Sequence, residues 1–124
     1  GLESITIPSS VNSIYPTVFI GCKSLTSVTI NTNTAMTYAD HFSGCPIETV
    51  TYGEGVTSIP DNAWKDCATL TTVNLPSTLT TIGASAFASC SQLTSIEIPN
   101  GVTTIGNEAF KYNTELKEII LRTK

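Results

Sequence analysis

The sequence predicts a repeat solenoid with a parallel β-sheet along one side. Three observations indicate this fold class: similar phrases recur, cysteines and aromatic residues mark a constant period, and a short alternating segment has the same place in each period. The phrases LTTVNLPSTLTTIGASAF and LTSIEIPNGVTTIGNEAF begin at Leu70 and Leu93, 23 residues apart. A period of about 20 to 50 residues is typical of proteins built from stacked repeats.

The cysteines define the length of one repeat. They recur at intervals of 23, 22 and 23 residues, and one further interval leads to Asn113. An aromatic residue stands three positions before each of these residues. Because this aromatic column has the period of the repeat, we expect its rings to lie in the core. The cysteines are Cys22, Cys45, Cys67 and Cys90, and the aromatic residues are Phe19, Phe42, Trp64, Phe87 and Phe110.

Each repeat contains one strand pattern, L-x-x-V/I-x-I/L, which ends in alternating apolar and polar residues. Alternation places the apolar side chains on one face of a strand and the polar ones on the other. We therefore expect six parallel strands in about five coils. Pro8, Pro76 and Pro99 follow the strand patterns directly, where a residue without an N–H ends the ladder at little cost. The patterns occupy residues 2–7, 25–30, 47–52, 70–75, 93–98 and 116–121.

The rest of each repeat returns the chain to the start of the next strand. A second apolar pair, such as Leu79 and Ile82, points back to the core. The three-residue spacing from Phe87 to Cys90 fits one helical turn that faces inward. We expect short turns or helical turns on the side of the solenoid opposite the sheet.

The segment from Asn31 to Gly44 departs from this pattern. It lacks the second apolar pair, so we expect a local bulge with Met36 and Tyr38 as substitute core residues. Its His41 is the one histidine of the chain and is close in sequence to Cys45. However, Cys45 belongs to a repeated column, which indicates a packing role, and a nucleophile also needs an orienting group and oxyanion donors. We therefore predict no catalytic residues and no enzyme.

The stretch LPSTLTTIGASAFASCSQLTSIEI, from Leu75 to Ile98, resembles the BspA-like leucine-rich repeats, and the resemblance covers essentially the whole chain. It implies a right-handed solenoid with the sheet on its concave face, carried by surface-exposed or secreted proteins. Adhesion and protein binding are the usual activities of that family. Typical leucine-rich repeats have Asn or Cys three positions after the strand pattern; this chain does not, so we expect no Asn ladder there. The residues at that place are Ser10, Asn33, Gly55, Thr78 and Gly101.

The cysteines allow three interpretations: a column of buried thiols, disulfides, or a metal site. Neighbouring coils are near enough for a disulfide, but equivalent side chains project in parallel, which argues against one. No C-x-x-C pair or second histidine supplies metal ligands at the usual spacing. We favour a column of reduced, buried thiols, which behave as small hydrophobic residues, and we predict no metal and no cofactor.

Composition limits the class of partner. Hydrophobic residues make up 40% of the chain, which is ample for a continuous core, while charged residues make up only 13%. The net charge of -4 and six unclustered Lys and Arg residues argue against nucleic-acid binding. No apolar run approaches the ~20 residues that cross a bilayer, so we expect no membrane insertion. We expect one domain, residues 1–124, that is part of a longer array and associates through uncapped end coils.

The candidate binding surface is the polar face of the strands, which a solenoid gathers into one hydroxyl-rich surface. We predict a non-enzymatic module of a cell-surface or secreted protein that binds another protein through this face. Threonine also suits any solvated strand, so a structural spacer without a ligand is the alternative. Binding to ice or another crystal surface is a distant third, because Asn74, Glu97 and Ile120 interrupt the threonine array. The predicted face contains Ser27, Thr29, Thr49, Thr51, Thr72, Asn74, Ser95 and Glu97.

Overall fold

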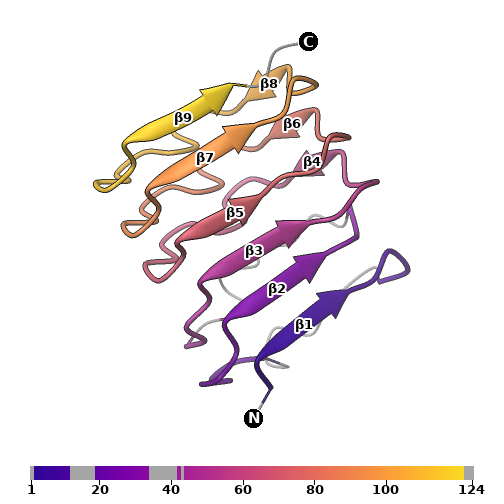
Figure 1. Ribbon diagram of the computed structural model, residues 1–124, viewed down its shortest axis with the longest axis vertical. Coiled ribbons are helices and arrows are strands. Elements are labelled where there is room, and N and C mark those ends of the chain that lie inside the picture. Colours follow the sequence, from indigo (N-terminus) through magenta and orange to yellow (C-terminus); the bar gives the residue numbers. More distant parts are fainter. Residues whose placement is uncertain (1, 12–18, 34–41, 43, 122–124) are drawn as a thin grey trace.

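A computed structural model describes residues 2–11, 19–33, 42 and 44–121. They form a parallel β-solenoid of about four turns, so the expected count of about five coils is not confirmed (Figure 1). No helix occurs in the described ranges, and thus none there could span a membrane. Most of the irregular segment from Asn31 to Gly44, with Met36, Tyr38 and His41, lies outside the described residues.

The six strand patterns of the sequence all form strands, which run in the same direction across Figure 1. In three coils the second residue of the second apolar pair lies in an additional two-residue strand, so the described part of the chain has nine strands rather than six. The long row consists of β1 (Ser4–Ile7), β2 (Ser27–Ile30), β3 (Thr49–Tyr52), β5 (Thr72–Asn74), β7 (Ser95–Ile98) and β9 (Glu118–Leu121). The short row consists of β4 (Ser58–Ile59), β6 (Thr81–Ile82) and β8 (Thr104–Ile105).

Strands pair with their equivalents in the neighbouring coil. The long row is divided into a four-stranded sheet, β1-β2-β3-β5, and a two-stranded sheet, β7-β9, while β4-β6-β8 form a third. The register follows the sequence repeat, so that Val28 of β2 lies opposite Ile5 and Val50. Each position therefore forms a column of equivalent residues through the solenoid, and the inward-facing apolar residues of the inner coils form one buried core.

The helical turn expected from Phe87 to Cys90 is not confirmed. This segment is a series of tight turns in which Ser85 and Ser89 have positive φ angles of 57° and 59°. The N–H of Ala88 donates to the Ser85 carbonyl in its own coil at 3.2 Å, whereas that of Phe87 donates to Ala109 in the next coil at 2.9 Å. Alternate N–H groups thus bond within and between coils, which a helix would not permit.

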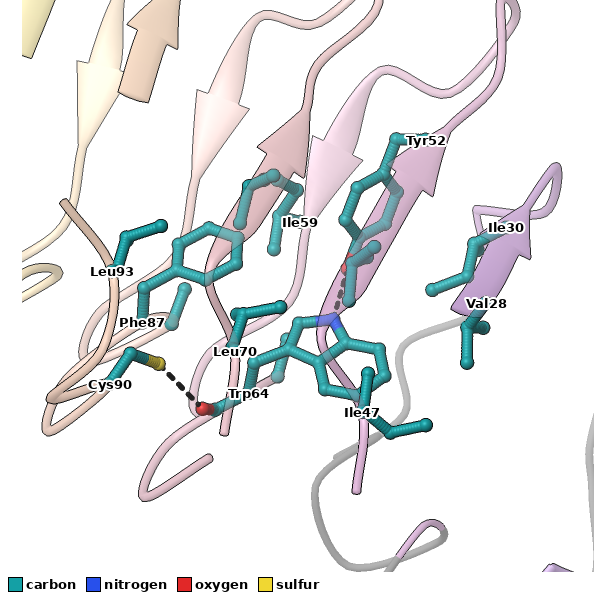
Figure 2. Packing of buried hydrophobic residues seen from close by; sticks show 14 of the residues in the cluster. Val28, Ile30, Ile47, Tyr52, Ile59, Trp64, Leu70, Phe87, Cys90 and Leu93 are labelled. Atoms are coloured by element: carbon teal, nitrogen blue, oxygen red, sulfur yellow. Dashed lines mark hydrogen bonds between the residues drawn. The ribbon is translucent and has the colours of Figure 1, made fainter. Parts of the chain in front are cut away.

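The aromatic column lies in the core as predicted. Phe42 stacks on Trp64 with ring centroids 5.8 Å apart, and Phe87 stacks on Phe110 at the same distance. Trp64 is fully buried, and its indole Nε1–H donates to the Tyr52 hydroxyl at 2.9 Å, as Figure 2 shows. The ring thereby gains apolar contacts without leaving its polar group unpaired.

The core and the polar strand face should respond very differently to truncation. We expect Phe87→Ala to cost about 3 to 5 kcal/mol of unfolding free energy, because Phe87 is fully buried. Thr72→Ala, on the exposed side of β5, should cost within about 0.5 kcal/mol. Chemical denaturation of both variants measures the two costs, and equal losses would contradict the inward and outward assignments.

Candidate functional site

The strand face is the outward side of β1, β2, β3, β5, β7 and β9. The structure places all eight predicted residues on it, in two parallel rows set by the strand register. The first row contains Ser4, Ser27, Thr49 and Thr72, followed after the sheet boundary by Ser95 and Glu118. The second row contains Thr6, Thr29, Thr51 and Asn74, followed by Glu97 and Ile120.

The polar side chains of β2 and β3 are half-buried, whereas those of β1, β5, β7 and β9 are exposed. Thr49 and Thr51 are half-buried between their neighbours, whereas Thr72 and Asn74 are exposed. The Asn74 amide Nδ2 donates to the Thr51 hydroxyl at 3.1 Å, so this step of the second row is joined by a side-chain hydrogen bond. The Asn74 amide is therefore held in place against the neighbouring strand.

A groove opens on this face between β5 and β7. Its volume is about 610 Å³, and four predicted residues line it: Thr72, Asn74, Ser95 and Glu97. Ile120 also lines it, and this side chain is 42% exposed and lies opposite Glu97 in the register. The groove thus joins polar residues of two coils to one accessible apolar side chain.

The groove coincides with an interruption in the main-chain hydrogen bonds between coils. Just before each strand, an N–H donates to the equivalent carbonyl of the preceding coil, as from Thr71 to Glu48 at 2.9 Å and from Lys117 to Thr94 at 2.9 Å. Of the five described steps in this column, only the step from Thr94 to Thr71 lacks the bond. The long-row strands of these two coils, β5 and β7, are also not paired with each other.

Proline removes a further bond at the other end of the groove. After β2, the N–H of Asn31 donates to the Ile7 carbonyl at 2.9 Å, and Gly53 does the same to Ile30. The equivalent residue after β7 is Pro99, which has no N–H to donate to Leu75. Pro76 likewise has no N–H after β5, but among the described coils only the contact between β5 and β7 lacks the bond at both of its ends.

The cysteine column has a bonding role in addition to its packing role. The four cysteines are free thiols; Cys45 and Cys90 are buried, whereas Cys22 and Cys67 are only partly buried, in contrast to the expectation that all four are buried. The Sγ–H of Cys90 donates to the Trp64 carbonyl at 3.2 Å (Figure 2), and that of Cys45 donates to Phe19 at 2.8 Å.

Asn113 continues this column with a stronger donor. Its Nδ2 donates to the carbonyl of Phe87 at 2.9 Å and to that of Phe110 at 2.6 Å. A thiol or an amide at this place thus bonds to the carbonyl of the aromatic residue in the preceding coil. The bonding is structural, because the groups that it satisfies are main-chain carbonyls.

The pKa values of three of the thiols are raised above the ordinary value for cysteine. Burial raises the pKa of Cys90 from 9.0 to about 12 and also raises the pKa values of Cys45 and Cys67. A thiol with a raised pKa stays protonated and is a poor nucleophile near neutral pH. His41 lies outside the described residues, and no group of three or more potential metal ligands occurs within them.

Comparisons with known proteins define the family of this solenoid. The BspA type leucine rich repeat region matches residues 1–123 in six copies, and the chain belongs to this family. No curated protein sequence matches the chain.

Several solved structures are similar over nearly the whole chain. A leucine-rich repeat protein from Bacteroides ovatus is 32% identical, with a TM-score of 0.74 over 99% of this chain and 33% of that one. A leucine rich cell surface protein from Faecalibacterium prausnitzii is 30% identical, with a TM-score of 0.66 over 99% of this chain and 40% of that one. The pneumococcal vaccine antigen PcpA is 26% identical, with a TM-score of 0.69 over 97% of this chain and 30% of that one. The chain therefore spans less than half of each of these relatives.

Sequence reasoning found the polar rows but not the groove. The strand patterns at 70–75 and 93–98 are as alike as any other pair, so nothing in them indicates that β5 and β7 separate. Pro99 was a partial signal, yet Pro76 has the same place one coil earlier, where β3 and β5 do pair. The sequence did contain one signal that the strand face changes at this point, namely Ile120, an apolar residue in an otherwise polar row.

Cys90 should be unreactive in the folded protein. The thiolate is the reactive form, and a pKa of about 12 keeps it scarce at pH 8. We expect thiol reagents to label all four cysteines in denaturant, but Cys90 only as fast as the native protein unfolds. Labelling followed by mass spectrometry identifies each site, and rapid native labelling of Cys90 would contradict its placement.

The same pKa predicts a loss of stability in alkali. Between pH 9 and 12 the unfolded chain releases the Cys90 proton while the folded chain keeps it, so the free energy of unfolding falls as pH rises. The slope from this one group is at most about 1.4 kcal/mol per pH unit. The free energy of unfolding of Cys90→Ala should fall less steeply between pH 9 and 12. The variant lacks the Cys90 thiol, while its other titrating groups are unchanged.

Proposed function

We propose that the chain is a non-enzymatic protein-binding or adhesion module of a cell-surface or secreted protein, and that it binds through the strand face. The observation that carries this proposal is the pair of polar rows, which align side chains from successive coils at a fixed spacing. Repeat proteins commonly use such extended surfaces to bind partners. The relatives described as a cell surface protein and a vaccine antigen support the location.

The alternative is a spacer, in which the strand face has no ligand of its own. Half-burial of Thr49 and Thr51 and the bond from Asn74 to Thr51 are compatible with a purely structural role. The groove favours binding over the spacer, because a solenoid that only separates other domains needs no opening between two of its coils.

The binding proposal is tested with the purified chain and a panel of extracellular-matrix and serum proteins in surface plasmon resonance. We expect saturable binding to at least one of them. Thr29→Arg adds a bulky charge to the strand face and should weaken that binding at least tenfold. Thr104→Arg, on exposed β8 in the short row, is the matched control and should leave it unchanged. If the chain binds none of these proteins saturably, the result would support the spacer.

We also propose that the end coils associate with a second copy of the chain. Leu2 is 48% exposed and Ile119 is 47% exposed, whereas their equivalents in inner coils, Leu25 and Ile96, are 0% and 2% exposed. If β9 of one copy lies beside β1 of another, Lys117 comes next to Glu3 in the same column. The contact would join opposite charges as well as bury apolar surface.

Sedimentation velocity over a wide concentration range tests this association. We expect a concentration-dependent dimer that Lys117→Glu weakens by placing two acids together, and that the further change Glu3→Lys restores. Ala68→Lys, in an exposed turn of an inner coil, should have no effect. A wild-type chain that stays monomeric throughout would rule out end-to-end contact.

A further inference from the structure

The groove between β5 and β7 has a specific chemical character. The described part of its walls carries hydroxyl and amide groups, one carboxylate and several aliphatic side chains, and it includes neither a basic nor an aromatic residue. These described residues therefore offer no cation to attract phosphate and no flat aromatic surface of the kind that commonly stacks on sugars. Glu97 is the one charged group in the described lining.

The carboxylate and the apolar surface of the groove are adjacent. Glu97 and Ile120 lie opposite each other in the pairing of β7 with β9, and both side chains are exposed. Side chains at paired positions of neighbouring strands stand about 5 Å apart. A lysine or arginine has the matching form, with an aliphatic stem that covers apolar surface and a cationic head that bonds to a carboxylate.

The main chain of the groove suits an extended segment. Thr71 and Thr94 both line it, and the main-chain bond that joins their equivalents in other described coils is missing between them. The Thr71 carbonyl and the Thr94 N–H can thus accept from and donate to the main chain of a peptide that lies in the groove, as the edge of a sheet does when it binds an added strand.

We propose that this groove is a subsite for a lysine or arginine side chain presented by an extended segment of a protein partner. The stem lies on Ile120, the head bonds to Glu97, and the main chain of the segment bonds to Thr71 and Thr94. The inference rests on the proposed function, since it names the chemistry of the partner that the strand face binds. The net charge of -4 favours the same cationic partner at long range.

Two-dimensional ¹H–¹⁵N NMR of the isotope-labelled chain tests the subsite with defined peptides. The probes are acetyl-Gly-Lys-Gly-amide and its arginine analogue, with norleucine and glutamate analogues as controls. We expect saturable shifts of the Thr94, Ser95, Glu97 and Ile120 amide signals with the two basic peptides. The norleucine and glutamate peptides should bind at least fivefold more weakly, because they lack the cationic head. Equal shifts from all four peptides would overturn the proposal.

Matched variants separate the subsite from general attraction between opposite charges. Glu97→Gln and Ile120→Thr should each weaken binding of the lysine peptide at least threefold. Glu48→Gln removes the same charge from an exposed position beside the strand face but outside the groove, and should leave the affinity unchanged. Equal losses in Glu97→Gln and Glu48→Gln would show that net charge alone attracts the peptide, and the proposal would fail.

The two proposals fail in different ways. If a matrix or serum protein binds in a manner sensitive to Thr29→Arg while the basic peptides shift no groove signal, the subsite is wrong and the binding face stands. If the peptides bind in the groove but no protein of the panel binds, the subsite stands and the wider binding face is wrong.

Discussion

The spacing between coils is the constraint on which the rest of this structure depends. Hydrogen-bonded strands lie about 4.8 Å apart, so each residue is held at that distance from its own equivalent one repeat away. Gly83 shows how strict this is: an added Cβ would lie 2.6 Å from the Asp61 main chain of the preceding coil. Larger residues are admitted only where they can stack in parallel, as the rings of Phe42 and Trp64 do. The sequence repeats because each position must hold a residue that is compatible with this distance in every coil.

The spacing also explains why hydroxyl and thiol groups are so common in the columns. A short side chain with one donor can reach the carbonyl of the equivalent residue, or of one near it, in the preceding coil. Thr80 donates to Thr57 at 3.0 Å, and Cys90 donates to Trp64 at 3.2 Å. Both carbonyls also accept a main-chain bond, so the side chain adds a second bond that ties one coil to the other. Threonine and cysteine are thus part of the framework, and their presence alone is no evidence of chemistry.

The sequence predicts those parts of the fold that follow from local period. The six strands and the aromatic column could be assigned because alternation and the repeat both place the same residues inward. The turns could not be assigned, because Ser85 and Ser89 adopt positive φ without the glycine that usually marks this conformation. Their geometry is stabilised by bonds such as that of Ser89 to Lys111 in the next coil, at 2.7 Å. The polar rows of the candidate site could be predicted for the same reason as the strands. The groove could not, because it forms between coils and has no local sequence pattern.

The groove forms because the hydrogen-bonded spacing between two coils is kept on one side of the solenoid and not on the other. Coils on its two sides remain joined elsewhere, since β6 pairs with β8 and the turn N–H of Phe87 bonds to Ala109 beyond it. Only the strand-face side opens, where Pro99 cannot donate and Thr94 does not bond to Thr71. An opening on one side costs little when the core columns on the other side stay packed, because the apolar burial that stabilises the solenoid is retained. A repeat scaffold can therefore form a specific surface by leaving one ladder unpaired, without altering the residues that make its coils stack.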